Sequence, residues 1–162
     1  MNVLLIEDDD FKAQQVSLFL RKNIPDVSLQ EAKSVHAGSR ALRQQSYDLL
    51  LLDMSLPTYT IVAGEAGWRP QGFGGRDVLR NLERQGLTLP VIVITQFERF
   101  ESGDEEIDIS TLRAQLEREH SSNFLGLIYF DATTDSWQAE LSEILASLRH
   151  SYPGQTEEHR HA

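Results

Sequence analysis

The sequence predicts an α/β fold in which a mostly parallel sheet is covered by helices on both faces. Short apolar runs alternate along the chain with segments of helical periodicity. Runs such as the four leucines at 49–52 and VIVI at 91–94 are apolar throughout, which is typical of strands buried on both faces. The 162 residues fit one domain, expected over 1–150, with a disordered tail over 151–162.

The first half of the chain is expected to hold three strands and two helices. Residues 3–6 form a short apolar strand, and 11–22 carry apolar residues at helical spacing. Residues 27–33 alternate weakly and favour a second strand, whereas 35–45 favour a helix. The leucine run at 49–52 completes this half as a third, fully buried strand.

The second half repeats the alternation with three helices and two strands. Residues 76–84 place their apolar side chains on one helical face, and 91–94 are rich in β-branched residues typical of strands. Residues 109–119 form a polar helix, 124–130 a fifth strand and 137–148 a closing amphipathic helix.

Two long connections follow expected strands and should lie at the same edge of the sheet. The segment 58–75 is rich in glycine and carries Trp68 and Phe73. The segment 97–108 is strongly acidic and is expected to be a loop. Connections beyond the carboxyl ends of parallel strands are where such folds place their ligands.

The charge balance excludes several classes of function. The formal net charge of −10 argues against binding to nucleic acids or anionic membranes, which need clustered cations. Cysteine is absent, and the only lysines are Lys12, Lys22 and Lys33. The N-terminus lacks the basic start of a signal peptide, and no apolar segment has the length of a membrane span. We therefore expect a cytoplasmic protein.

Polar residues follow three of the expected strands and should converge at one sheet edge. Glu7 and Asp8 follow the first strand, Asp53 the third and Thr95 the fourth. Carboxylates gathered in this way repel one another, and hard oxygen ligands favour Mg²⁺ or Mn²⁺. A carboxylate beside such a cation can accept a phosphoryl group. In isolation these aspartates also fit helix caps, and a start such as DDDF weakly resembles a haloacid-dehalogenase-like phosphatase.

Three pieces of sequence, VLLIEDDD, YDLLLLDMSLP and LPVIVITQ, occur in the order found in receiver domains of two-component response regulators. The resemblance covers about residues 1 to 149. It implies a flavodoxin-like, doubly wound sheet of five parallel strands in the order 2-1-3-4-5. It also implies that Asp53 accepts the phosphoryl group and that the hydroxyl of Thr95 senses it. The implied ligands of Mg²⁺ or Mn²⁺ are oxygen donors: Glu7, Asp8, Asp53, the carbonyl of Ser55, and Asp9 as a further candidate.

One departure from the receiver pattern concerns a cation. Receivers carry a lysine after the fifth strand, where this chain has Phe130 in the preferred register, or Tyr129 or Ala132 in others. An arginine is the expected substitute, with Arg99 as first choice ahead of Arg69 and Arg76 because it follows the fourth strand directly. The missing lysine predicts a weaker response to phosphorylation.

The resemblance implies a response-regulator receiver in a phosphorelay, with a histidine kinase or related phosphodonor and a downstream signalling protein as partners. No nucleic acid or membrane is expected as a partner, and a homodimer is compatible with the sequence. Chemistry beyond phosphorylation and dephosphorylation of Asp53 is not expected, so the chain is not a conventional enzyme. The alternative is a degenerate receiver that acts as a phosphorylation-independent protein-interaction module.

Overall fold

The computed structural model describes residues 1–59, 74–102 and 105–151. Five parallel strands form a sheet in the order β2-β1-β3-β4-β7, as expected. Their bounds are β1 Asn2–Ile6, β2 Ser28–Ala32, β3 Leu49–Leu52, β4 Val91–Thr95 and β7 Phe124–Tyr129. The doubly wound, receiver-like fold predicted from the sequence is therefore confirmed.

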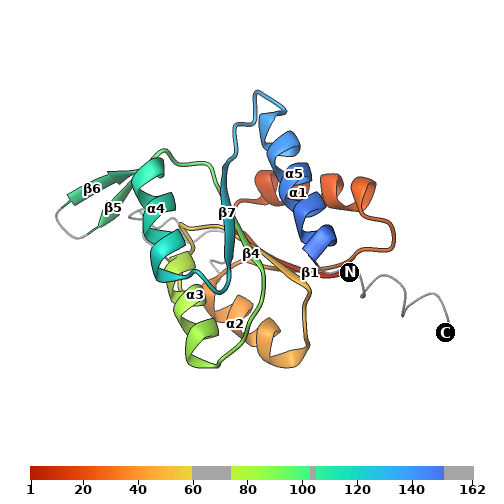
Figure 1. Cartoon of the computed structure of the whole chain (residues 1–162), viewed down its shortest axis with the longest axis horizontal. Helices are drawn as coiled ribbons and strands as arrows, with labels where there is room; N and C mark the ends of the chain where they lie inside the picture. The colour runs from red at the N-terminus through yellow and green to blue at the C-terminus, as the bar shows by residue number, and fades with distance from the viewer. Residues whose placement is uncertain (60–73, 103–104, 152–162) are drawn as a thin grey trace.

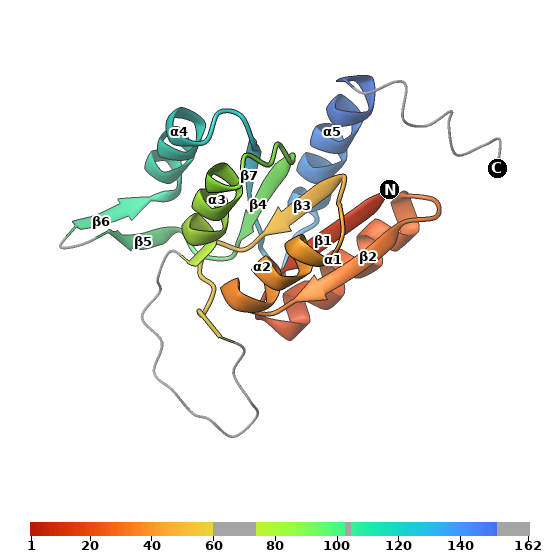
Figure 2. The same ribbon diagram turned by 90° about the horizontal axis from the view of Figure 1, so that it is seen from below.

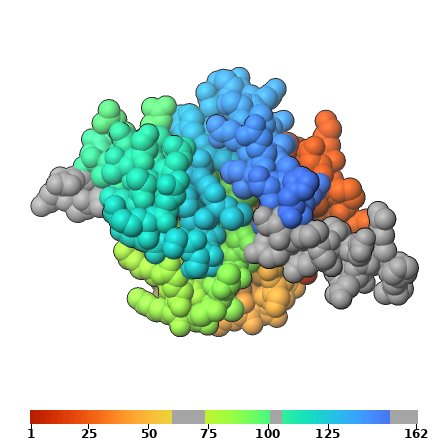
Figure 3. Space-filling model, viewed as in Figure 1, coloured from red at the N-terminus to blue at the C-terminus, as the bar shows by residue number. Residues whose placement is uncertain are grey.

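In the described ranges, five helices cover the two faces of this sheet (Figure 1). Their bounds are α1 Asp10–Asn23, α2 Val35–Gln44, α3 Gly74–Arg84, α4 Ile109–Glu119 and α5 Ser136–Ser151. Helices α1 and α5 pack on one face, and α2, α3 and α4 on the other. The space-filling view shows α4 and α5 on either side of β7, the edge strand of the sheet (Figure 3). Within the described residues, no helix is long and apolar enough to cross a membrane.

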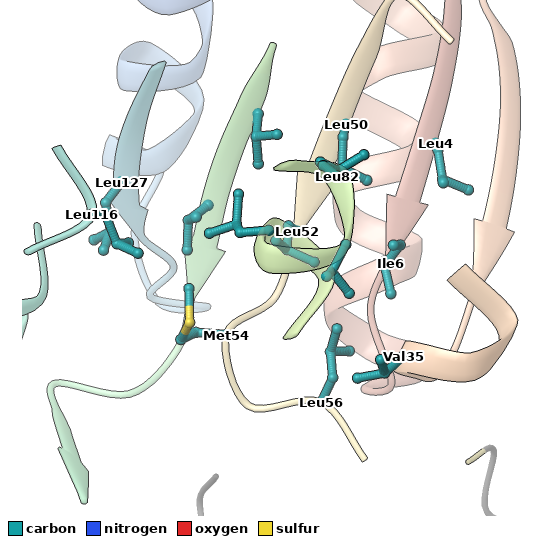
Figure 4. Close-up of a cluster of buried hydrophobic side chains, with 14 of the residues drawn as sticks. Leu4, Ile6, Val35, Leu50, Leu52, Met54, Leu56, Leu82, Leu116 and Leu127 are labelled. Atoms are coloured by element: carbon teal, nitrogen blue, oxygen red, sulfur yellow. The ribbon is translucent and has the colours of Figure 1, made fainter. Parts of the chain in front are cut away.

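Strand β3 shows why the central strands are apolar throughout. Leu50 and Leu52 point into the cluster under α2, α3 and α4, where they pack with Leu82 (Figure 4). Leu49 and Leu51 point to the opposite face, under α1 and α5. Because successive side chains of a strand alternate between faces, a strand covered on both sides needs apolar residues at every position.

The acidic segment 97–108, expected as a loop, contains an antiparallel hairpin instead. Strands β5 (Arg99–Ser102) and β6 (Glu105–Asp108) pair there, and the hairpin projects beside α4 (Figures 1 and 2). Phe100 and Ile107 face each other across it and are buried in the core. These two apolar side chains tie an otherwise charged ribbon to the domain. Trp68 and Phe73, expected near the site, lie outside the described residues.

Candidate metal centre at the carboxyl ends of the strands

Three carboxylates meet where β1 and β3 end. The two strands are neighbours with Ile6 opposite Leu52, and the Asp53 amide donates to the Ile6 carbonyl at 2.9 Å. This register sets Asp53 beside Glu7 and Asp8, so that one oxygen from each carboxylate lies within 4.8 Å of the others. Glu7 and Asp53 are buried and Asp8 is half-buried. The convergence expected from the sequence is therefore present.

Burial makes the negative charges of this cluster costly. It raises the pKa of Glu7 to about 8, with further elevation from Asp53, and outweighs the lowering by Lys12. Burial likewise raises the pKa of Asp53, with Lys12 lowering it and Asp8 raising it. When all three carboxylates are ionised, they and the one ammonium carry two excess negative charges, which one divalent cation would balance. Because the donors are all hard oxygens, they fit Mg²⁺ or Mn²⁺.

The ammonium in this cluster belongs to Lys12, which lies in the first turn of α1 and is 1% exposed. Its Nζ lies 2.5 Å from Oε2 of Glu7 and 3.2 Å from Oδ1 of Asp53. Nζ also donates to the carbonyl of Ile94, at the end of β4, at 2.6 Å. An ammonium has three protons to donate, and here each has an acceptor.

Sequence reasoning missed Lys12, although a signal was present. Val16, Phe19 and Leu20 form the buried stripe of α1, and Lys12 lies four residues before Val16 on the same face. A lysine on the apolar face of a helix needs a buried acceptor, because an unpaired ammonium is very costly away from water. Combined with the carboxylates at the neighbouring strand ends, this position could have predicted the contact.

The expected substitute cation, Arg99, is elsewhere. Its side chain is 72% exposed on the hairpin, and its Nη1 lies 3.8 Å from Oε1 of Glu106. Arg76 is buried and contacts Gln115 of α4. Arg69 lies outside the described residues. The prediction that Arg99 takes the place of the lysine is wrong, because the cation at Asp53 is Lys12.

Position 130, where receivers carry a lysine in the preferred register, is apolar and buried. The Phe130 amide donates to the Thr95 carbonyl at 2.7 Å, which places this residue beside the end of β4. Its ring packs on Trp137 of α5, with centroids 5.2 Å apart. The structure therefore offers no ammonium from this position.

The other predicted site residues have distinct places. Thr95 is fully buried at the end of β4, and its hydroxyl accepts from the Phe97 amide at 3.2 Å. Asp9 caps α1 by accepting from the Lys12 amide at 2.8 Å, and it is not part of the carboxylate cluster. Ser55 lies two residues after Asp53 in the connection that leaves β3. Its carbonyl remains a predicted ligand.

Gly75 lets α3 approach this connection closely. A Cβ at Gly75 would lie 2.6 Å from the carbonyl oxygen of Asp53, and the Gly75 amide donates to the Met54 carbonyl at 3.0 Å. The start of α3 thus packs directly on the backbone that carries Asp53. Any side chain at this position would displace that backbone.

Comparison with known proteins decides the family. The sequence profile of the response regulator receiver domain matches residues 3–113. The chain belongs to the response regulator receiver family. This membership places it among the signalling domains rather than among conventional enzymes, and it agrees with the fold and with the acidic cluster at the strand ends.

Relatives extend the likeness over nearly the whole receiver. The uncharacterized protein y4jR of Sinorhizobium fredii is 23% identical over 150 residues, which are 91% of this chain and 99% of that protein. The Detocs response regulatory protein DtcB of Enterobacter cloacae is 26% identical over 148 residues, covering 90% and 99%. The Mn²⁺-bound form of the response regulator Rcp1 has a TM-score of 0.59 at 20% identity, over 88% of this chain and 90% of that one.

Proposed function

We propose that this receiver accepts a phosphoryl group on Asp53 in a phosphorelay and passes the signal to a protein partner. Glu7, Asp8, Asp53 and the Ser55 carbonyl would hold Mg²⁺ or Mn²⁺ beside the acceptor. The hydroxyl of Thr95 would contact a phosphoryl oxygen. The observation that carries the proposal is the buried carboxylate cluster, whose oxygens lie within 4.8 Å of one another in a chain of the receiver family.

The chemistry requires one nucleophilic oxygen and a means of balancing charge. A carboxylate oxygen of Asp53 attacks the phosphorus of a phosphohistidine, the P–N bond breaks, and the imidazole leaves with its electron pair and takes up a proton. A bound divalent cation would neutralise charge on the phosphoryl oxygens. Burial of Asp53 limits access of water, which would hydrolyse the aspartyl phosphate.

We further propose a histidine kinase or related phosphodonor as the upstream partner and a cytoplasmic setting. The net charge of −10 supports protein partners rather than nucleic acid or membrane. The phosphorylation-independent interaction module stays the alternative, since Phe130 occupies the position of the family's lysine. The two functions differ in whether Asp53 is chemically modified.

A small-molecule phosphodonor distinguishes the phosphorylated receiver from the phosphorylation-independent interaction module. Wild-type protein incubated with acetyl phosphate and Mg²⁺ should gain one phosphoryl group, read by phosphate-affinity electrophoresis and intact mass. Asp53→Asn should abolish the gain, and chelation of Mg²⁺ should suppress it. The matched control is Asp48→Asn, because Asp48 precedes β3 at the opposite edge of the sheet and accepts from the Asn2 amide at 2.7 Å. Absence of labelling in the wild type would favour the interaction module.

A further inference from the structure

Lys12 is a fully buried cation whose three donors bind three different strand ends. Glu7 follows β1, Asp53 follows β3 and Ile94 belongs to β4. Taking an ammonium out of water costs several kcal/mol unless it is well paired, so this arrangement is demanding to build. A lysine that only completed the core of α1 would be replaceable by an apolar residue of similar length. The position of Nζ beside Asp53 therefore indicates that the ammonium has a role in the chemistry of Asp53.

No other cation of the described residues reaches Asp53. Arg99 is on the hairpin with Glu106, and Arg76 contacts Gln115. No lysine follows Lys33 in the sequence, and position 130 carries a buried phenylalanine ring. Within the described part of the chain, the positive charge at the acceptor comes from α1 alone.

We propose that Lys12 is the cation that binds the phosphoryl group on Asp53, supplied from the first turn of α1 instead of from the end of β7. The inference rests on the proposed phosphorylation of Asp53. When the O–P bond forms, the N–H that now donates to Oδ1 of Asp53 turns to a phosphoryl oxygen. The other two N–H groups stay on Glu7 and on the Ile94 carbonyl. Conversion of the carboxylate to a dianionic acyl phosphate adds one negative charge, which strengthens this contact.

Two other roles for Lys12 predict different behaviour. As a purely structural counter-ion, it would affect folding and leave the binding of a phosphoryl mimic unchanged. As a replacement for the metal, it would compete with Mg²⁺ and would oppose the binding of a mimic that needs the metal. Measuring Mg²⁺ and phosphoryl-mimic affinities separately distinguishes all three.

The first test compares Lys12→Met with wild type by calorimetric titration of Mg²⁺ and of beryllofluoride at saturating Mg²⁺. Loss of a charge-assisted contact should weaken beryllofluoride binding by about tenfold to a hundredfold. Mg²⁺ affinity should be kept or should rise, because a positive charge next to the metal site is removed. The matched control is Lys33→Met, since Lys33 pairs with Asp10 at the surface and should leave both affinities unchanged.

A second measurement needs no variant and so does not depend on whether Lys12→Met folds. The chain has three lysines, so ¹⁵N-lysine labelling gives three ammonium signals to resolve by NMR. Addition of Mg²⁺ and beryllofluoride should shift the Lys12 signal and leave those of Lys22 and Lys33 in place. If beryllofluoride binds the wild type while the Lys12 signal and the Lys12→Met affinity are unchanged, the inference is wrong and the proposed function survives. If the wild type neither binds beryllofluoride nor is phosphorylated, both are wrong.

Discussion

Glu7 is a buried carboxylate of the cluster, and its negative charge is costly to bury. It is 3% exposed, and burial raises its pKa to about 8 despite the ammonium of Lys12 at 2.5 Å. An ordinary glutamate in the unfolded chain has a pKa near 4.5. The folded, metal-free protein therefore binds a proton at Glu7 more strongly than the unfolded chain does, and this difference makes stability depend on pH.

The sign of that dependence gives the first prediction. Between pH of about 4.5 and about 8 the folded state holds the extra proton, so stability present below this window is lost as pH rises through it. In chelator, the free energy of unfolding should fall by up to about 1.4 kcal/mol per pH unit. Glu7→Gln should remove this contribution, as measured by urea unfolding from pH 5 to 8.

Two comparisons make the pH test specific. Glu140→Gln, at an exposed glutamate of α5, should keep the wild-type slope. Added Mg²⁺ should flatten the slope of the wild type, because the cation and the proton compete for the same oxygens. An unchanged slope in Glu7→Gln would show that Glu7 does not titrate in this window.

The residues at the strand ends were predictable because topology alone brings them together. Glu7, Asp8, Asp53 and Thr95 each follow an apolar run, and parallel strands deliver their carboxyl ends to one edge. Lys12 was not predicted, because a lysine in a helix is ordinarily solvated. The apolar stripe of α1 does place Lys12 on the buried face, but the acceptors that make its burial possible follow strand ends distant in the sequence.

At the scale of elements, the first turn of α1 contacts both Glu7, which follows β1, and Asp53, which follows β3. Asp9 caps the helix through the Lys12 amide at 2.8 Å, and its own amide donates to Oε1 of Glu7 at 3.0 Å. The same residue, Lys12, then sends its side chain to Asp53. The first turn of α1 is therefore bound to the site through the Asp9 backbone and the Lys12 side chain. The geometry of this turn sets where the ammonium of Lys12 lies.

The second prediction follows from this dependence of Lys12 on its helix cap. Asp9→Ala removes the cap and should cost about 1 kcal/mol of stability. It should also weaken beryllofluoride binding several-fold, because the turn that positions Lys12 is loosened. Asp9→Asn should retain both properties, since asparagine caps as well as aspartate but carries no charge.

A second helix cap provides the matched control. Asp108 caps α4 by accepting from the Thr111 amide at 2.8 Å. Asp108→Ala should cause a similar loss of stability in thermal unfolding with no change in beryllofluoride affinity. Equal effects of Asp9→Ala and Asp108→Ala on that affinity would mean that α1 has no special relation to the site.

The hairpin of β5 and β6 shows a different limit of sequence reasoning. Its residues are mostly charged, and acidic segments are ordinarily solvated connections. Phe100 and Ile107 reverse that expectation by pairing across the ribbon and packing into the cluster under α4. Two apolar positions seven residues apart carry too little periodicity to reveal a hairpin before the long-range contact is known.

At the scale of the whole molecule, a cation can reach Asp53 from either of two places, the start of α1 or the end of β7. In this chain the cation comes from α1, and its contact with the Ile94 carbonyl ties α1 to β4 across the sheet edge. Receivers commonly carry a lysine after the fifth strand. The corresponding position in this chain is Phe130, which packs on α5. The route by which a phosphoryl group alters the domain should differ accordingly, since a ligand acts on the elements that it contacts.

The last prediction concerns a double variant in which the ammonium comes from the end of β7 instead of from α1. Phe130→Lys combined with Lys12→Met removes the ammonium of α1 and supplies one from the end of β7, where the Phe130 amide already bonds the Thr95 carbonyl. Beryllofluoride affinity, lowered in Lys12→Met, should rise again by about tenfold relative to that single variant, the equivalent of about 1.4 kcal/mol. Phe130→Lys alone loses the ring contact with Trp137 and serves as the stability control.

Hydrogen exchange should show which elements respond in each protein. On binding beryllofluoride, the wild type should gain protection in the first turn of α1, because Lys12 bonds the ligand from there. In the double variant the gain should move to the β7–α5 connection, which then carries the ammonium. Affinity that recovers while α1 still gains protection would mean that α1 responds to the metal and the carboxylates alone. The side of the sheet that signals would then be independent of where the lysine is placed.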